Sequence, residues 1–430
     1  MRIWLVQPGE PLPTDGDSPR LLRTGQLAAE LARRGHDVTW WATTFRHATK
    51  TQRAARDAQL EIAANYRIML LHSPGYASNV SLRRFVDHRI VGRRFRDWAR
   101  REQRPDIIQC AFPPIELAFE TARYAAERDV PWVIDARDMW PDIYVEAVPA
   151  LLQPVARLLL RPDFRMTRVA FAGADAITGH APGFVQWGLQ YAARARTELD
   201  LDIPFGYPSV RPDPAASERA DREWRSLGVG ATANEFNICF FGTFAAREEV
   251  DLVTVIAAAR VLQQRAPHVR FVLCGVGPSS ERIRALADGL GNVVLPGWVD
   301  FPHIWTLLRA SQLGLLPYLS SRDFALSIPN KAVEYLSGDL PILTSLKDGY
   351  LHGVLEQAGC GRFYTGGDAD SLVQAVLAAC SAGAQLSQER QAAARLYEAR
   401  FAEPIVNDRL IDHLLGVRSA HLAARKSPAA

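Results

Sequence analysis

Residues 236–277 read FNICFFGTFAAREEVDLVTVIAAARVLQQRAPHVRFVLCGVG, and this stretch decides the fold class. It opens with an apolar run, FNICFFG, continues with helix-period apolar residues over 250–264, and returns to an apolar run, VRFVLCGVG. Short continuous apolar runs are typical of strands that are buried on both faces. A strand, a helix and a second strand in this order predict one unit of a parallel sheet.

The same alternation of strands and helices recurs on both sides of this stretch. In the N-terminal half, a strand at 2–7 and a helix at 21–34 precede VTWWAT, and PDIIQCAF, a helix at 115–128 and PWVIDARD repeat the pattern. NVVLPGWV, LGLLPYL and PILTS extend it in the C-terminal half. The sequence therefore predicts an α/β protein with two Rossmann-like, doubly wound parallel-sheet domains.

The amino-acid composition along the chain indicates the expected domain boundaries. Residues 202–234 are rich in Pro, Gly, Ser, Ala and charge and contain no strand-like run. We place an N-terminal domain at 1–205, a linker at 206–234, a C-terminal domain at 235–400, and a last helix with a tail at 401–430.

Length, charge and cysteine usage exclude several classes of protein. A chain of 430 residues suits two domains that each bury their own core, and a net charge of +3 argues against a dedicated nucleic-acid binder. The five cysteines are scattered, which indicates neither a disulfide framework nor a zinc site. The first residues resemble a strand rather than a signal peptide, and no apolar run reaches the ~20 residues that cross a bilayer. We expect a cytoplasmic protein.

Two stretches are basic and apolar together. Leu82 to Arg104 contains nine Arg against three acids, with apolar residues at roughly helical spacing, and it predicts a basic amphipathic helix. LLQPVARLLLRPDFRMTRVAF, at 151–171, has Asp163 as its only acid. A solvated face or a face packed within a domain explains either stretch as well.

Glycines follow the predicted strands of the C-terminal half. Gly242 ends one strand, and Gly275 with Gly277 ends the next, at the sheet edge where doubly wound folds bind ligands. Tight turns alone would also explain these glycines. GVGPS does not match the dinucleotide fingerprint G-x-G-x-x-G, so NAD is not expected.

Residues 327–345, SIPNKAVEYLSGDLPILTS, hold the most informative polar pattern. Pro329 and Asn330 mark a helix start, with Lys331 in the first turn and Glu334 three residues later. A cation conflicts with the positive end of a helix dipole unless an anion lies nearby. A diphosphate would resolve the conflict, and Glu334 could then accept hydrogen bonds from ribose hydroxyls. A surface helix with an ion pair is the alternative.

In the N-terminal half, VIDARDMWPD places Arg137 and Asp138 just after an apolar strand. Asp138 could orient or deprotonate an acceptor hydroxyl, and Arg137 could contact a phosphate. An ion pair that stabilises the loop is the alternative.

Several blocks together resemble the family-4 glycosyltransferases of GT-B fold, above all the branch used in bacterial capsule, O-antigen and exopolysaccharide assembly. The blocks are LLRTGQLAAELARRGHDVTWW, PDIIQC, PWVIDARDMWPD, FVLCGVGP, NVVLPGWVDFPHIWTLLRASQLGLLPY and IPNKAVEYLSGDLPILTS. The resemblance implies a nucleotide-sugar donor held by the C-terminal domain, an acceptor held by the N-terminal domain, and a final helix that crosses back. It also implies retention of configuration and no metal or other cofactor, because protein cations and helix dipoles neutralise the diphosphate.

The resemblance also assigns site residues. Arg137 falls near the active-site histidine of many relatives, with Asp138 beside it, and these two are the expected catalytic residues. The turn 296–299 corresponds to the one whose backbone reads the nucleobase, and Glu334 to the glutamate that holds the ribose. The expected donor-binding residues are Gly242, Arg247, Gly275, Gly277, Trp298, Val299, Ser327, Asn330, Lys331 and Glu334. The expected phosphate-near loop of the N-terminal domain includes Gly16, Ser18 and Arg23.

Two positions depart from the family pattern. Many relatives carry an Arg and a Lys after the strand that ends at Gly242, whereas GTFAAREEVD has Arg247 as its only cation. The first glutamate of the family's paired-glutamate motif corresponds to Leu326. Diphosphate binding then rests on Arg247 and Lys331 or is weaker, and donor-sugar recognition does not transfer from relatives.

The expected function is transfer of a sugar from a nucleoside diphosphate, UDP above all, to a saccharide or polyprenyl-diphosphate-linked acceptor. A lipid-linked acceptor would favour peripheral contact with the inner face of the membrane through Leu82 to Arg104. Two alternatives share the fold, namely a nucleotide-sugar epimerase and a non-catalytic partner subunit. Loss of an activity in Glu334→Ala and Asp138→Ala would exclude the partner subunit.

Overall fold

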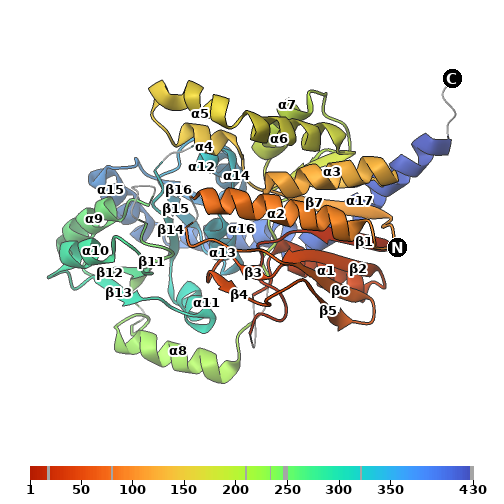
Figure 1. Cartoon of the computed structure of the whole chain (residues 1–430). Helices are drawn as coiled ribbons and strands as arrows, with labels where there is room; N and C mark the ends of the chain where they lie inside the picture. Colours follow the sequence, from red (N-terminus) through yellow and green to blue (C-terminus); the bar gives the residue numbers. More distant parts are fainter. Residues whose placement is uncertain are drawn as a thin grey trace. The chain divides into compact units, whose positions relative to one another are not determined.

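The computed structural model describes residues 1–16, 20–78, 81–208, 211–232, 234–245, 250–319 and 322–426. The chain forms two compact units (Figure 1). Unit 1 comprises Met1–Pro204 and Val406–Ala430, and unit 2 comprises Phe205–Ile405. Each unit has its own largely parallel sheet with helices, which confirms the predicted fold class.

Unit 1 is built on a sheet of eight strands. The strands are β1 (Arg2–Val6), β2 (Asp37–Thr43), β5 (Ala58–Ala63), β6 (Tyr66–Leu71), β7 (Ile107–Phe112), β8 (Trp132–Ala136), β9 (Ala176–Gly179) and β10 (Leu201–Asp202). Their order is β10-β9-β8-β7-β1-β2-β6-β5, and all neighbours pair parallel except β5 and β6. A small hairpin, β3 (Phe45–Arg46) and β4 (Thr51–Gln52), follows β2. The strand order reverses between β1 and β7, the point where such sheets bind ligands.

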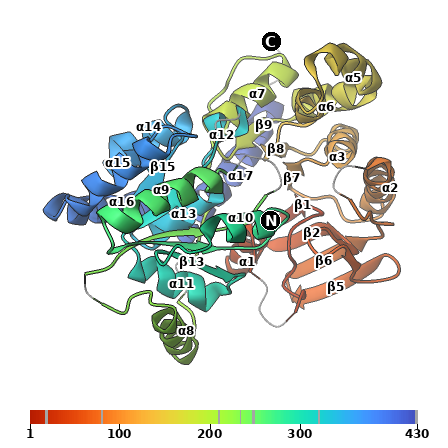
Figure 2. The same cartoon turned by 90° about the vertical axis from the view of Figure 1, so that its left-hand side faces the viewer.

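Helices cover both faces of this sheet (Figure 2). They are α1 (Arg23–Arg33), α2 (Leu82–Ala99), α3 (Ile115–Arg128), α4 (Asp142–Glu146), the 3-10 helix η1 (Ala150–Leu152), α5 (Gln153–Leu159), α6 (Arg161–Gly173), α7 (Pro182–Ala192) and α17 (Glu403–Lys426). Successive strand residues point to opposite faces, so Trp40 packs with Leu27 of α1 while Trp41 packs against Phe95 of α2. A strand buried on both faces explains the continuous apolar run VTWWAT.

Helix α17 belongs to the core of unit 1 although it ends the chain. Its residues Val406, Leu410, Leu414 and Val417 are almost fully buried in the same cluster as Ile3 of β1. The helix continues to Lys426 and so includes the first six residues of 421–430. No helix in the described part of the chain has the length and apolarity that a bilayer crossing requires.

Unit 2 contains six parallel strands. They are β11 (Phe236–Phe241), β12 (Val269–Cys274), β13 (Val293–Gly297), β14 (Leu313–Leu316), β15 (Ile342–Thr344) and β16 (Gly361–Phe363), in the order β13-β12-β11-β14-β15-β16. Its helices are α8 (Pro214–Ser226), α9 (Leu252–Arg265), α10 (Ser280–Ala287), α11 (Phe301–Ala310), α12 (Arg322–Leu326), α13 (Asn330–Ser337), α14 (Tyr350–Ala358), α15 (Ala369–Cys380) and α16 (Ala384–Arg400). The strand order reverses between β11 and β14, so the loops that follow these two strands frame the expected ligand site.

The segment predicted as a linker, 206–234, contains helix α8. Trp224 is 2% exposed, and its indole Nε1 donates hydrogen bonds to the Thr306 Oγ1 and the His303 carbonyl of α11, both at 3.1 Å. A helix with one buried anchor and a charged outer face has the composition of a loop, which is why composition alone did not reveal it.

Candidate functional site

Five residues predicted for donor binding surround one pocket at the carboxyl edge of the unit 2 sheet. The pocket measures about 270 Å³, and its wall includes Gly242, Gly275, Trp298, Val299 and Lys331. These residues come from three neighbouring strand ends and from the start of α13. The residues selected from the sequence are up to 89 positions apart, and the fold places them around one cavity.

Close approach explains the two glycines of this pocket, Gly242 and Gly275, and also Gly277 beside it. Strands β11 and β12 run in register, and the Gly242 N–H donates to the Cys274 carbonyl at 2.9 Å. A Cβ atom on Gly275 would lie 1.9 Å from the Gly242 carbonyl oxygen, and one on Gly277 would lie 2.3 Å from that of Phe244. A Cβ on Gly242 would lie 2.4 Å from Lys331 Cε. No side chain larger than hydrogen fits these positions without displacement.

Lys331 lies across the point where the strand order reverses. Its helix, α13, comes after β14, yet its side chain covers Gly242 at the end of β11. The first turn of α13 contains no acid, and its N-cap Pro329 makes no side-chain capping bond. An ammonium group and the N–H groups of a helix start thus lie at one pocket, which is an arrangement that binds phosphate.

Trp298 provides the apolar surface of the pocket. It follows β13 and remains 73% exposed, although tryptophan is among the largest apolar side chains. An indole exposed at a pocket rim offers a flat face on which a planar ring can stack.

Three other predicted donor residues lie on α13 or just before it but outside the pocket wall. Glu334 is 8% exposed, on the buried side of α13. Burial raises the pKa of Tyr318, and the charge of Glu334 raises it further. Asn330 is exposed at the first helical position, and Ser327 is half-buried before it. Arg247 lies outside the described residues.

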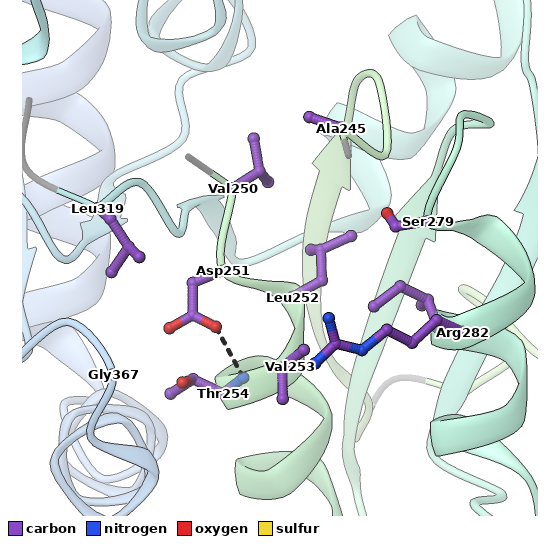
Figure 3. Close-up of a pocket in the computed structure, with 11 residues that line it drawn as sticks. Ala245, Val250, Asp251, Leu252, Val253, Thr254, Ser279, Arg282, Leu319 and Gly367 are labelled. Carbon is purple, nitrogen blue, oxygen red and sulfur yellow. Dashed lines mark hydrogen bonds between the residues drawn. The ribbon is translucent and has the colours of Figure 1, made fainter. Parts of the chain in front are cut away.

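A second pocket in unit 2 contains none of the predicted residues. It measures about 260 Å³ and opens at the start of α9, beside Ser279 and Arg282 (Figure 3). Asp251 caps α9, and its carboxylate accepts a hydrogen bond from the Thr254 N–H at 3.0 Å (Figure 3). The carboxylate is thus used within the fold, and Arg282 is the one cation among the described lining residues.

Unit 1 holds a buried charge network at the carboxyl edge of its sheet. Asp135, fully buried in β8, contacts Arg23 Nε at 3.1 Å and accepts from Arg137 Nε at 2.8 Å and from Thr178 Oγ1 at 2.9 Å. The Arg137 Nη1 donates to Glu10, which follows β1. Two arginines and two carboxylates therefore balance one another in the interior, as buried charges require.

The network determines the state of Asp135. Burial raises the pKa of this carboxyl group, but the charges of Arg23 and Arg137, with hydrogen bonds from Arg137 and Thr178, lower it more. The net effect is a pKa below the ordinary value, so Asp135 stays ionised.

Arg137 and Asp138 both have partners within unit 1. All three guanidinium nitrogens of Arg137 donate hydrogen bonds, the third to Thr24 Oγ1 at 3.0 Å. The Asp138 carboxylate accepts from the Met139 N–H and the Trp140 indole, both at 2.9 Å. Arg137 thus forms ion pairs with Asp135 and Glu10, while Asp138 accepts hydrogen bonds within its own loop. A direct role of either residue in catalysis stays a prediction.

Sequence reasoning missed three polar residues at this edge, namely Glu10, Asp135 and His180. His180 follows β9 and is 7% exposed. Burial and the charge of Arg23 lower its pKa to about 4, with smaller opposing effects from Asp135 and Ala136. The imidazole is therefore neutral near pH 7. The sequence signals were an acid inside the apolar run VIDA and a histidine directly after AITG.

The described residues of the predicted phosphate-near loop lie in different surroundings. Arg23 is 4% exposed, and its Nη1 donates to the carbonyls of Ile203 and Pro204 at 2.8 and 2.9 Å. Gly16 lines a separate pocket beside Asp15 and Arg53. Ser18 lies outside the described residues.

Two family models match the chain and together cover most of it. Residues 235–381 match the model described as "Glycosyl transferases group 1". Residues 22–202 match the model described as "Glycosyl transferase 4-like domain". No curated protein matches the chain at the level of sequence.

Solved structures resemble the chain over nearly its whole length. Sucrose-phosphate synthase from Thermosynechococcus elongatus has a TM-score of 0.69 at 14% identity, covering 97% of this chain and 99% of its own. HepE of Anabaena in complex with UDP has a TM-score of 0.64 at 17% identity, covering 96% and 99%. WaaG, a glycosyltransferase involved in lipopolysaccharide biosynthesis, has a TM-score of 0.62 at 14% identity, covering 97% and 100%. At these identities the likeness shows the fold.

The first family model coincides with the unit whose sheet edge carries the Lys331 pocket, and the second with the unit that carries the buried charge network. Two parallel-sheet units of this architecture form the GT-B fold, which the solved structures share. The chain is therefore a glycosyltransferase of GT-B fold and belongs to group 1, with a family-4-like N-terminal domain.

Proposed function

We propose that the protein transfers a sugar from a nucleoside diphosphate, UDP in the first place, to a saccharide or polyprenyl-diphosphate-linked acceptor. The pathway we propose is the assembly of a bacterial surface polysaccharide, and the stereochemical outcome is retention, as the family resemblance implies. The observation that carries the proposal is the pocket formed by Gly242, Gly275, Trp298, Val299 and Lys331.

The chemistry of the pocket supports a nucleoside diphosphate as ligand. The ammonium group of Lys331 and the N–H groups at the start of α13 would neutralise the diphosphate, and they would stabilise the negative charge that develops on it as the glycosidic bond breaks. Trp298 and the backbone of Val299 would bind the base, and Glu334 would accept hydrogen bonds from the ribose. HepE of Anabaena, a structure of similar fold, has been solved with UDP and with UDP-glucose.

The roles proposed for unit 1 concern the acceptor. Asp138 would orient the acceptor hydroxyl or accept its proton, and Arg137, held in place by Glu10 and Asp135, would contact a phosphate. Because both catalytic assignments rest on the family resemblance, Asp138→Asn is the informative variant. It keeps the size of the side chain while removing the charge.

Thermal unfolding in the presence of UDP, GDP, ADP or NAD tests the donor site. A ligand that binds only the native state raises the apparent stability, so we expect UDP at 100 times its Kd to raise Tm by about 5 °C or more. Glu334→Ala should reduce this shift by removing the ribose contact. Trp298→Ala should reduce it as well, and because Trp298 is exposed this variant should fold normally.

Each outcome of this experiment decides something specific. A selective shift with one nucleoside diphosphate that is lost in both variants supports the proposed site and names its base. Stabilisation by NAD alone, or by none of the four nucleotides, would contradict a nucleoside diphosphate sugar as the donor.

A further inference from the structure

The segment after α4 carries an apolar surface that no described residue of unit 1 covers. Five large side chains within nine residues are more than half exposed, and neither η1 nor α5 contains a buried residue. We call them the α5 surface, which consists of Leu151 (92%), Leu152 (53%), Val155 (52%), Leu158 (60%) and Leu159 (74%). Single exposed leucines are ordinary, whereas a contiguous group of them marks a binding surface.

Arginines without acidic partners flank this surface. Arg157 lies on α5 itself, and Arg161, Arg165 and Arg168 follow on α6 at a spacing of four and three residues, which places them on one face of that helix. All four are exposed, and none forms an ion pair with an acid in the described ranges. Asp163, the one acid of α6, is buried. The exposed charged residues of α5 and α6 are therefore all cationic.

Helix α2, the other basic stretch, has a different arrangement. Its apolar residues Val91 and Phe95 are buried, and Phe95 packs edge-on against Trp4 and Trp41 of the sheet. Three of the six arginines of α2 form ion pairs with acids of the same unit, in the contacts Arg89–Glu116, Arg94–Asp57 and Arg96–Glu120, and Arg100 directly after the helix pairs with Glu127. The apolar face of α2 thus belongs to the core of unit 1, and half of its arginines are paired with acids of that unit.

We propose that the α5 surface docks on an anionic lipid bilayer. The leucines would enter the boundary between headgroups and acyl chains, and the four arginines would bind lipid phosphates. Charge favours this occupant over a second copy of the chain, because a twofold contact would bring like arginines together. The contact rests on the proposed function in that a lipid-linked acceptor would lie in the same membrane. The docking itself requires neither nucleotide nor acceptor.

Figure 1 shows α5 at the outer end of the helices α4 to α7 of unit 1. Its neighbours are α4, η1 and α6, so substitutions on its outer face disturb no core contact. The surface can therefore be changed without unfolding the protein, which makes the proposal testable in the full chain.

Flotation of the full-length protein with vesicles tests the proposal. The vesicles contain equal parts of phosphatidylglycerol and phosphatidylcholine, and the comparison uses phosphatidylcholine alone. We expect the wild type to float with the anionic vesicles. The partition coefficient of Leu151→Ser/Leu158→Ser/Leu159→Ser should be at least ten times lower. Arg161→Gln/Arg165→Gln should bind the anionic vesicles more weakly at low salt, and added salt should weaken its binding less than that of the wild type. Leu82→Ser/Val86→Ser changes exposed apolar residues of α2 and should bind as the wild type does.

Three results would overturn the proposal. The first is a wild type that does not float with anionic vesicles, and the second is a triple variant that binds like the wild type. The third is a wild type that forms dimers which the triple variant lacks in size-exclusion chromatography, because the α5 surface would then be an interface between copies. Because the vesicles carry no sugar nucleotide, each of these results leaves the UDP experiment to decide the donor site separately.

Discussion

Asp135 shows how the first unit keeps charge in its interior. It lies inside β8 with no exposed surface, and it contacts Arg23 and Arg137, which come from different elements. Removing one member of such a buried group leaves an uncompensated charge, which typically costs ~3–5 kcal/mol. The network therefore gives Arg137 a structural role that does not depend on any catalytic one.

His180 makes the stability of unit 1 sensitive to pH. Its folded-state pKa of about 4 lies below the ordinary value of 6.5, so between these values the unfolded chain binds a proton that the folded chain does not. Stability is then lost as the pH falls from about 6.5 towards 4. Between pH 7 and pH 5 this single group accounts for about 2 kcal/mol of the free energy of unfolding.

His180→Gln should remove that part of the pH dependence. Urea unfolding followed by tryptophan fluorescence measures the free energy of unfolding of both proteins at pH 7 and pH 5. Groups that both proteins share cancel in the comparison, among them Glu116, whose pKa is raised to about 7 by burial. His268→Gln, an exposed histidine of unit 2, is the control and should behave as the wild type does. Equal acid sensitivity of His180→Gln and the wild type would contradict the neutral, buried imidazole.

Residue by residue, the sequence pattern selected the residues of the Lys331 pocket better than those of the buried charge network. Gly242, Gly275 and Lys331 follow apolar strands or open a helix, so local pattern was enough to select them. Arg23 contacts Asp135, and Glu10 contacts Arg137, only because the fold brings the loop after β1, the start of α1 and the end of β8 together. These contacts are tertiary, so a local sequence pattern does not predict them.

At the scale of elements, most of the buried strands and the helices between them were predictable, whereas some elements with a polar outer face were not. The helix expected at 115–128 is α3 with the same bounds. The strands β5 and β6 and the helix α8 went unrecognised. In β5 the apolar residues alternate with exposed polar ones, as befits the edge of a sheet, and such a pattern is weaker than the continuous runs of the central strands.

Helix α8 should contribute to the stability of unit 2 in spite of its loop-like composition. Trp224→Ala removes a buried indole and its hydrogen bonds to α11, and we expect a loss of about 3 kcal/mol in the free energy of unfolding. Leu227→Ala, at the end of the same helix but 46% exposed, should change it by less than ~0.5 kcal/mol. Chemical unfolding of both variants measures the difference. If Trp224→Ala were as stable as Leu227→Ala, α8 would be a linker after all.

For the molecule as a whole, the order of the strands explains where the chemistry lies. In unit 2 the reversal between β11 and β14 brings the start of α13 to the end of β11, so Lys331 and Gly242 meet although 89 positions separate them. Repetition of strand and helix along the sequence was enough to predict two such units. The 14–17% identity to the solved structures of like fold shows that this architecture tolerates wide variation in sequence.

The most direct test of the donor site is a calorimetric titration of UDP into the wild type, Lys331→Met and Lys347→Met. Methionine keeps an unbranched side chain that can lie over Gly242 and removes the charge, while Lys347 is an exposed lysine of the same unit whose Nζ donates to Thr365 at 2.7 Å. We predict that Lys331→Met weakens UDP binding about tenfold or more, as expected for a lost charge-assisted contact with phosphate, and that Lys347→Met leaves it unchanged. Equal UDP affinity of the wild type and Lys331→Met would contradict the donor site described for this glycosyltransferase.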